Sequence, residues 1–499
     1  MGRKQGDPLT FPESRRVRLP AAGLLPDDPG RAAYSATRSA HWDDLAREHQ
    51  SGSIPSRAYH DRLAEIYRFL VPPGARVLEI GCSAGDLLAA LNPSAGVGID
   101  FSAAMVATAR QRHSHLRFEV ADAQDLDLGE DFDVIILSDL IIDLWDVQGV
   151  LERVRAHATR RTRIIINSYS RLWEAPLGIA ARLGLARPSL QRNWLTRDDL
   201  TNLLRLAGFE VVRAWEEVLL PLPIPVVREL CNRILVRFWP FRHLALTHFV
   251  VARVPLPVTA ETTVSVIVAA RNEAGNVRNI FDRTPEMGAR TELIFVEGGS
   301  SDDTGGEIER QIAAHPERVA RLYKQTGRGK GDAVRLGFAH ATGDVLMILD
   351  ADLTMPPEQL PRYYAALVSG AGEFINGVRL VYPMEQQAMR FANLVGNKCF
   401  SLAFSWLLGQ PIKDTLCGTK VLWRNDYERI AAQRAYFGDF DPFGDFDLIF
   451  GAAKLGLRIV DLPIRYHERT YGETNIDRWR HGVILLRMVM FAAGRIKFT

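Results

Sequence analysis

Two carboxylates one residue apart, Asp350 and Asp352, follow directly after the apolar run at residues 345–349. Alternate side chains of an extended chain point to the same side, so this pair is placed to hold one hard cation such as Mg²⁺ or Mn²⁺. The apolar run is typical of a buried strand, and open α/β sheets bind ligands where such strands end. Asp-x-Asp also occurs in acidic turns that bind nothing. The neighbouring motifs therefore have to distinguish a metal site from such a turn.

Three more polar loops stand near this pair in the second half of the chain. The strand predicted at 264–270 runs into Arg271 and Glu273, and the strand predicted at 292–296 runs into Glu297 and Asp302. A glycine-rich turn places Lys330 at the start of a predicted helix, where a cation and free amides suit phosphate groups. The spacing of the glycines and Lys330 differs from that of a P-loop, so this turn is not one. Together with the Asp pair, these loops predict a site for a nucleotide diphosphate with a divalent cation.

A second set of motifs lies in the first half. A short predicted strand ends in a loop that carries Glu79, Gly81 and Gly85, and the next strand ends at Asp100. A carboxylate at that position is placed to accept the hydrogen bonds of a ribose diol. Ser83 stands where a dinucleotide-binding loop needs its middle glycine. The negative charge of Glu79, just before the turn, suits a cofactor with a cationic sulfonium better than one with an anionic pyrophosphate.

Composition limits the protein class. The chain has 499 residues, with 61 Lys and Arg against 59 Asp and Glu, so its net charge of +2 gives no general case for nucleic acid as a partner. Its four cysteines form no CxxC pair, which fits a reducing compartment and argues against a zinc site or a disulfide framework. No uncharged apolar run approaches the roughly 20 residues of a membrane span, and the N-terminus lacks a signal-peptide core. We expect a cytoplasmic protein.

The length favours two domains of α/β fold. We expect a disordered basic arm at 1–40, a first domain at 41–254, a proline-containing linker at 255–262 and a second domain at 263–499 that ends in an interfacial helix.

Residues 42–254 resemble the class I S-adenosylmethionine (SAM)-dependent methyltransferases. The resemblance implies a Rossmann-like sheet that binds SAM. It places Glu79, Gly81 and Gly85 at the methionine and sulfonium end, and Asp100 at the ribose. It places Asp122 and Ala123 at the adenine. Methyl transfer to an oxygen usually needs a nearby base to take the proton of the acceptor. The candidates near the mouth of the site are Asp139, Asp143, His60 and Tyr169, and we assign none of them.

Residues 263–498 resemble the family 2 glycosyltransferases of the GT-A fold, within the branch that is similar to dolichyl-phosphate mannosyltransferase. The resemblance implies a nucleotide-sugar donor whose phosphates meet Lys330 and whose metal is bound by Asp350 and Asp352. Thr354 replaces a frequent third metal ligand of this branch. The residues that the resemblance places around the base and ribose are Ala270, Arg271, Glu273, Glu297 and Asp302.

The sequence leaves two kinds of sugar acceptor open, a phosphate and a hydroxyl. A polyprenyl phosphate is already anionic and needs cations to hold it, for which Arg379, Lys420 and Arg469 are the candidates. A hydroxyl of a glycan or of a soluble acceptor needs a base, for which Asp445 or Asp447 is the candidate. Either acid is also explained as part of a capped helix start.

The two sets of motifs predict a bifunctional enzyme of glycan or lipid-linked saccharide biosynthesis. We expect inverting, metal-dependent sugar transfer to a polyprenyl phosphate or lipid-linked glycan, together with SAM-dependent methylation of an intermediate. A non-catalytic role of the first domain as a SAM-binding scaffold is the alternative. Apolar segments at 223–246, 391–408 and 483–491 either pack within the protein or lie on a membrane surface. We therefore expect peripheral contact with the inner face of the cell membrane.

Overall fold

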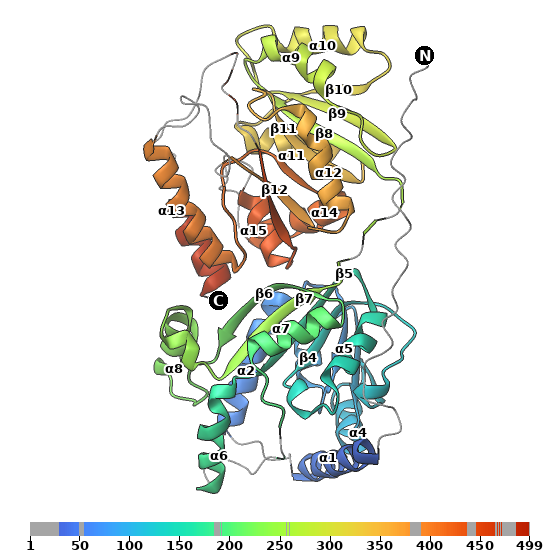
Figure 1. Cartoon of the computed structure of the whole chain (residues 1–499), viewed down its shortest axis with the longest axis vertical. Coiled ribbons are helices and arrows are strands. Elements are labelled where there is room, and N and C mark those ends of the chain that lie inside the picture. Colours follow the sequence, from blue (N-terminus) through green and yellow to red (C-terminus); the bar gives the residue numbers. More distant parts are fainter. Residues whose placement is uncertain are drawn as a thin grey trace, which may run out of the picture.

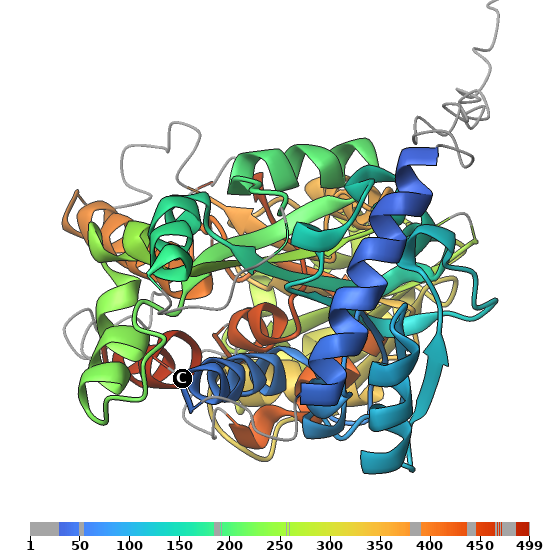
Figure 2. The ribbon, with the colours of Figure 1, turned by 90° about the horizontal axis from the view of Figure 1, so that it is seen from below.

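The chain folds around two seven-stranded sheets that lie one above the other in the computed structural model (Figure 1). The model describes residues 29–48, 54–183, 190, 192–255, 257–258, 260–379, 391–436, 446–464, 467, 469, 471 and 486–498. Both sheets are mixed and carry helices on both faces (Figure 2). The predicted fold class, two successive α/β domains, is confirmed.

The first sheet has the strand order β3-β2-β1-β4-β5-β7-β6. Strand β7 pairs antiparallel with β5 and β6, whereas the other pairs are parallel. Its strands are β1 (Arg76–Ile80), β2 (Ala95–Asp100), β3 (Arg117–Val120), β4 (Phe132–Ser138), β5 (Ala158–Tyr169), β6 (Glu210–Glu217) and β7 (Thr247–Arg253). Its helices are α1 (Pro29–Glu48), α2 (Ile54–Leu70), α3 (Asp86–Ala90), α4 (Ala103–Arg112), α5 (Val147–Ala156), α6 (Glu174–Arg182), α7 (Arg197–Leu206) and α8 (Val227–Glu229).

The second sheet has the order β10-β9-β8-β11-β13-β12-β14, in which β13 alone runs antiparallel to its neighbours. Its strands are β8 (Thr263–Ala270), β9 (Arg290–Glu297), β10 (Val319–Lys324), β11 (Val345–Asp350), β12 (Phe374–Val378), β13 (Lys420–Trp423) and β14 (Ile459–Pro463). Its helices are α9 (Ala274–Arg283), α10 (Thr304–Ala314), α11 (Lys330–His340), α12 (Leu360–Val368), α13 (Phe391–Leu408), α14 (Arg424–Ala432) and α15 (Phe446–Lys454).

Strand β11 explains why the apolar run before the Asp pair is continuous. Leu346 and Ile348 belong to the hydrophobic core on one face of the sheet. Val345, Met347 and Leu349 belong to the core on the other face. A central strand that is covered on both sides needs apolar residues at every position, so the run ends only where the chain leaves the sheet at Asp350.

One expectation needs correction. Residues 29–40, which we expected in a disordered arm, are part of helix α1. Asp43 of this helix accepts a hydrogen bond from Ser102 Oγ at 2.5 Å, which ties α1 to the start of α4. Residues 1–28 lie outside the described residues. No helix in the described part of the chain combines the length and the apolar character that spanning a bilayer requires.

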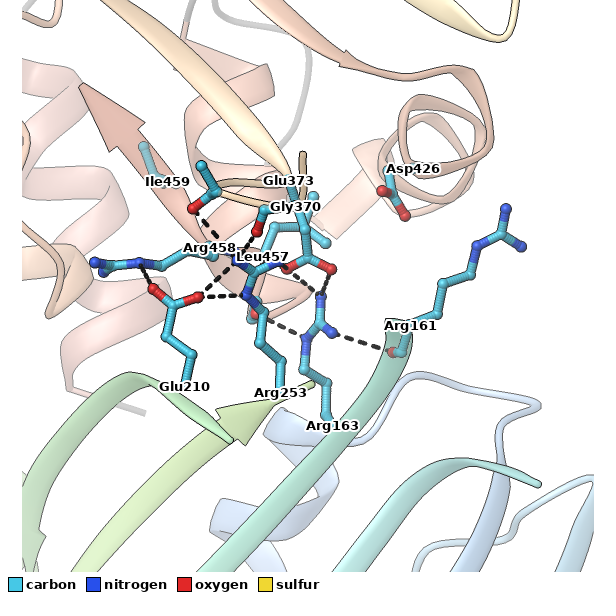
Figure 3. A network of polar contacts seen from close by, with 12 residues as sticks. Arg161, Arg163, Glu210, Arg253, Gly370, Glu373, Asp426, Leu457, Arg458 and Ile459 are labelled. Carbon is cyan, nitrogen blue, oxygen red and sulfur yellow. Dashed lines mark hydrogen bonds and ion pairs between the residues drawn. The ribbon is translucent and has the colours of Figure 1, made fainter. Parts of the chain in front are cut away.

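The two domains are joined by buried ion pairs (Figure 3). Arg163 of β5 donates to both carboxylate oxygens of Glu373 at 2.8 and 2.9 Å. Arg253 of β7 donates to the carbonyl oxygen of Gly370 at 2.6 Å, and its Nη1 lies 3.7 Å from Glu373 Oε2. From the other side, Arg458 Nε donates to Glu210 Oε1 at 2.9 Å. Each domain therefore supplies both a cation and a carboxylate to this contact.

The location of these pairs orients the whole molecule. Glu210 begins β6, and Glu373 and Arg458 immediately precede β12 and β14. Arg253 ends β7, the antiparallel strand, so it lies at the same edge of the first sheet as Glu210. The domains thus meet at the edges where their parallel strands begin. The edges where those strands end point away from each other, with α1 at one end of Figure 1 and α9 and α10 at the other.

Glu373→Gln tests the strength of this contact. The change leaves the buried Arg163 and Arg253 guanidinium groups without the Glu373 charge, and breaking a buried pair typically costs about 3–5 kcal/mol. We expect a clear fall in the urea midpoint of unfolding. The matched control is Glu358→Gln, which breaks the exposed pair with Arg283 and should cost at most about 1 kcal/mol. Equal losses in the two variants would contradict the interface.

Candidate active sites

The loops at the strand ends of the second sheet bring together residues that lie far apart in the sequence. Lys330 Nζ lies 2.5 Å from Asp350 Oδ1. Arg469 Nη2 donates to Asp352 Oδ2 at 2.8 Å, and its Nη1 lies 3.2 Å from Glu273 Oε1. Two cations and three carboxylates thus form one cluster at this edge of the sheet.

The carboxylates in this cluster differ in their electrostatics. Burial acts to raise the pKa of Asp350, but the Lys330 ammonium, with Lys420 and Arg379 further away, holds that pKa below its ordinary value. Burial raises the pKa of Glu273 to about 7, although Arg469 opposes the shift. Asp350 is therefore an anion at neutral pH, as a metal ligand must be.

Gly418 allows the close contact between Lys330 and Asp350. A Cβ atom at this position would overlap both the Lys330 ammonium and the Asp350 carboxylate. The backbone of the loop before β13 therefore packs directly against the pair. Any side chain there would push the two charged groups apart.

Hydrogen bonds connect the loops that follow β8 and β9. The Glu273 amide donates to Thr304 Oγ1 at 2.9 Å, and the Ala274 amide donates to Asp302 Oδ2 at 3.2 Å. Tyr471 Oη also donates to Asp302, at 3.2 Å, and brings the segment that carries Arg469 over this loop. Ala270 and Arg271 lie where β8 ends, and Glu297 lies where β9 ends. The predicted base and ribose residues therefore lie on neighbouring strand ends.

The residues expected to hold the acceptor phosphate have protein partners. Arg379 makes a bidentate contact with the buried Asp414, at 2.7 and 2.9 Å. Lys420 is fully buried and donates to the carbonyl oxygen of Cys417. Arg469 holds the two carboxylates described above. Their acceptor roles remain predictions.

Of the two candidate bases, Asp447 and Asp445, the structure describes only Asp447. Asp447 is nearly buried at the start of α15, where its Oδ1 accepts the Leu448 amide at 2.8 Å. Its Oδ2 lies 3.4 Å from Arg434 Nε and 3.9 Å from Arg335 Nη1. Asp445 lies outside the described residues. The role of either acid as a base remains a prediction.

The Asp350 and Asp352 pair fits a divalent cation that arrives with a substrate. Among the described residues, no three His, Cys, Asp or Glu side chains converge as a ready-made metal site. Mg²⁺ is commonly bound by one or two carboxylates together with substrate phosphates, so two ligands suffice here. Thr354 Oγ1 donates to Asp352 Oδ1 at 2.8 Å and orients that carboxylate.

The first sheet has an open cavity at its strand ends, with an empty volume of about 430 Å³ that includes the solvent space at its mouth. Gly81, Asp100, Asp122 and Ala123 line it, as the sequence predicts for the cofactor site. Glu79 and Gly85 do not line the cavity itself. Gly85 has a φ of 78°, and a Cβ atom there would lie 2.6 Å from the Phe118 ring, so this loop packs too closely for a side chain.

Helix α1 completes the cavity and is the part of the site that sequence reasoning missed. Tyr34, Ser35 and Arg38 of this helix line the cavity. Arg38 Nε lies 3.4 Å from Asp143, and the Tyr34 ring packs edge-on against Trp145 at 5.0 Å. Pro29 at the start of an alanine-containing stretch was the available signal for a helix start.

Two buried acids give this site its electrostatic character. Asp100 accepts the amides of Ser83 and Ser102, each at 2.9 Å, which leaves oxygen lone pairs for a ribose. Burial raises the pKa of Glu79 to about 8, and its buried Oε2 has no hydrogen-bond partner among the described residues. Glu79 does not line the cavity, but it directly precedes Ile80 and Gly81, which do, and a cationic cofactor bound there would stabilise its carboxylate. The residues therefore fit SAM.

A third, half-buried acid lies beyond the cavity, directly after β4. Asp139 adopts a φ of 52° and accepts hydrogen bonds from Tyr59 Oη at 2.9 Å and Asn167 Nδ2 at 2.7 Å. Burial raises its pKa to about 7, although the Tyr59 hydrogen bond opposes the shift. Tyr169, also considered from sequence, lies 5.8 Å from the Tyr59 ring. This cluster can accept a proton at neutral pH.

Comparison with known families matches each half of the chain. Residues 48–214 match the family described as "Methyltransferase domain", and residues 265–430 match "Glycosyl transferase family 2". One curated relative is the undecaprenyl-phosphate 4-deoxy-4-formamido-L-arabinose transferase of Klebsiella pneumoniae subsp. pneumoniae, with 25% identity over 223 residues. The match covers 44% of this chain and 63% of that protein's length.

Similar solved structures also fall into two groups. Glucosyl-3-phosphoglycerate synthase from Mycobacterium tuberculosis, in complex with Mn²⁺ and UDP, is 21% identical, with a TM-score of 0.35 over 47% of this chain and 80% of that one. Magnesium protoporphyrin IX methyltransferase from Synechocystis PCC 6803, with bound SAH, is 18% identical, with a TM-score of 0.32 over 45% and 98%.

The raised pKa of Glu79 makes SAM binding depend on pH. If the sulfonium stabilises the Glu79 carboxylate, binding releases a proton, and affinity rises with pH until the pKa of about 8 is passed. Calorimetry in buffers of different ionisation enthalpy measures that proton release. Glu79→Gln should remove this contribution, whereas the exposed Glu119→Gln should not. Equal proton release in wild type and Glu79→Gln would contradict the placement.

Proposed function

The chain joins a methyltransferase domain to a glycosyl transferase family 2 domain, and from this we propose a bifunctional enzyme of lipid-linked saccharide biosynthesis. The second domain transfers a sugar from a nucleotide-sugar to a polyprenyl phosphate, with inversion at the anomeric carbon. The first domain uses SAM to methylate an intermediate of the same pathway. The observation that carries the proposal is the cluster of Lys330, Asp350, Asp352 and Arg469 at the strand ends of the second sheet.

In this proposal, the chain's own residues prepare the donor site. Lys330 and Arg469 neutralise the two aspartates while no donor is bound. When a donor binds, both cations can turn toward its phosphates and stabilise the leaving diphosphate. A divalent cation on Asp350 and Asp352 supplies further neutralisation of that charge.

A lipid phosphate as acceptor is favoured by three observations. The Klebsiella relative is named for undecaprenyl phosphate. A phosphate acceptor is an anion and needs no base, which suits a site where the described acid Asp447 is engaged by Arg335 and Arg434. Arg379 and Lys420 add positive potential behind Asp350. Transfer to a glycan hydroxyl remains the alternative.

Contact with a membrane is supported by apolar surface on one side of the protein. The segment 222–244 consists of short helical turns around α8, and Val226 and Trp239 are 78% and 74% exposed. Its exposed apolar residues are Leu222, Ile224, Val226, Val227, Leu230, Ile234, Phe238, Trp239, Phe241 and Leu244. Leu402 of α13 and Met490 near the C-terminus are also exposed, and α8 and α13 lie on the same side of the molecule (Figures 1 and 2). We propose that this side lies on the cytoplasmic face of the cell membrane.

For the methyl transfer, we propose Asp139 as the proton acceptor. Its pKa of about 7 leaves a substantial fraction ionised at neutral pH, and Leu140, the next residue, lines the cofactor cavity. Tyr59 and Asn167 orient the carboxylate.

The glycosyl transfer is tested with the purified full chain, Mn²⁺ or Mg²⁺, a panel of nucleotide-sugars and a short polyprenyl phosphate. We expect metal-dependent formation of a lipid-phosphate sugar, which Asp352→Ala should reduce by at least about 100-fold because it removes a metal ligand. Asp282→Ala, an exposed acid on α9, is the control and should be fully active. Metal-dependent turnover with a glycan but none with the lipid would overturn the proposed acceptor.

A further inference from the structure

An open cavity lies between the two domains, apart from both strand-end sites, and its empty volume is about 540 Å³ including the solvent space at its mouth. The methyltransferase domain contributes residues of α2, of β6 and of the turn Leu235–Arg237. The glycosyl transferase domain contributes the end of α13 and the turn Ala493–Lys497. In Figure 1, α2 and β6 lie below this boundary, and α13 lies above it. The cavity exists only because the two domains are joined.

The cavity carries more positive than negative charge. Arg213, Arg237 and Lys497 line it, against the carboxylates of Glu65 and Glu217. Glu217 is buried and pairs with Arg237 and with Arg62 behind the wall. Glu65 lies at the more exposed rim. The buried Glu217 carboxylate thus already pairs with the guanidinium groups of Arg237 and Arg62. Arg213 and Lys497 add further positive charge.

Arg213 and Lys497 form no ion pair with the described residues. Arg213 stacks on the Trp215 ring at 4.5 Å, and Lys497 lies 5.2 Å from the Trp406 ring centre. The buried Nε atoms of Arg213 and Arg237 have no hydrogen-bond partner within the described part of the chain. Burial lowers the pKa of Lys497 to about 8, and repulsion by Arg237 and Arg213 adds to the shift. Such a group of charges is costly unless an anion joins it.

The remaining walls of the cavity are apolar. They come from both domains: Ile66, Phe69, Leu70, Trp215, Leu407, Leu408 and Ile496. Next to the cavity, Phe238 stacks on Trp406 at 5.9 Å and packs against Phe498 at 6.4 Å. Phe238 also belongs to the exposed segment 222–244. The apolar residues beside the cavity are thus continuous with the exposed apolar segment at the protein surface.

We propose that this cavity binds the anionic head group of a lipid phosphate, whose apolar chain extends along the Phe238 side. Arg213, Arg237 and Lys497 hold the head group, and the leucine and isoleucine walls hold the first part of the chain. The bound lipid contacts both domains, so it fixes their boundary and anchors the chain at a membrane. This site is independent of the proposed sugar transfer, because it shares no residue with the strand-end clusters.

The proposal is tested by calorimetry of the full chain with decyl phosphate, kept below its micelle concentration. We expect saturable binding at least about tenfold tighter than that of inorganic phosphate, and no binding of the neutral decyl maltoside at the same concentrations. Equal affinity for inorganic phosphate would show a free-anion site, and equal affinity for the maltoside would show a purely apolar cavity. Either result overturns the proposal.

Single substitutions test whether decyl phosphate binds in this cavity. Arg213→Gln and, separately, Lys497→Gln should each weaken decyl phosphate binding about tenfold or more, since each removes a charged contact. The exposed Arg205→Gln is the matched control and should bind like wild type. Arg469→Gln should also retain binding, and loss of binding there would place the lipid in the transfer site instead.

A stability measurement accompanies each variant. Removal of an uncompensated cation should leave the unfolding midpoint of the lipid-free chain unchanged or higher. Unchanged binding in folded Arg213→Gln and Lys497→Gln would refute the site.

Discussion

The buried ion pairs between the two sheets are the constraint on which the rest of the molecule depends. Arg163, Glu373 and Arg253 hold the edges where the parallel strands begin, so each sheet turns its opposite edge outward. Ligands of open α/β sheets bind at that opposite edge. The methyltransferase and glycosyl transferase sites therefore open at opposite ends of the molecule. If the two domains act on one intermediate, as proposed, that intermediate leaves the first site before it reaches the second.

This separation favours an intermediate that stays near the protein after release. A lipid-linked saccharide has this property, because its chain keeps it in the membrane. The exposed segment 222–244 and the exposed residues of α13 and the C-terminus lie on one side and belong to both domains. The proposed lipid-phosphate cavity is lined by Arg237 of that segment and by Lys497 near the C-terminus. In the proposed arrangement one membrane contacts both domains, so a lipid-linked intermediate can move between the two sites without a tunnel.

Local patterns in the sequence were sufficient for the fold class and for the strands that lead into the two candidate sites. The run into Asp350 and the loop from Glu79 to Gly85 each combine a strand, a turn and a chemical group within a few residues, so their positions follow from one element. The first part of helix α1, residues 29–40, was missed because the apolar residues of this helix form no clear stripe, and its place is set by contacts such as Asp43 with Ser102. The Arg163–Glu373 pair and the interdomain cavity join residues more than 200 positions apart, and no local pattern contains such pairings.

The most direct test of the account is whether both transfers meet on one lipid. The full chain is incubated with vesicles that contain polyprenyl phosphate, a nucleotide-sugar panel and SAM with a radioactive methyl group, and the lipid extract is counted. The account predicts methyl label in the lipid fraction only when the nucleotide-sugar is present, released with the sugar by mild acid. Label that enters a water-soluble product, or that enters the lipid equally without any nucleotide-sugar, would contradict it.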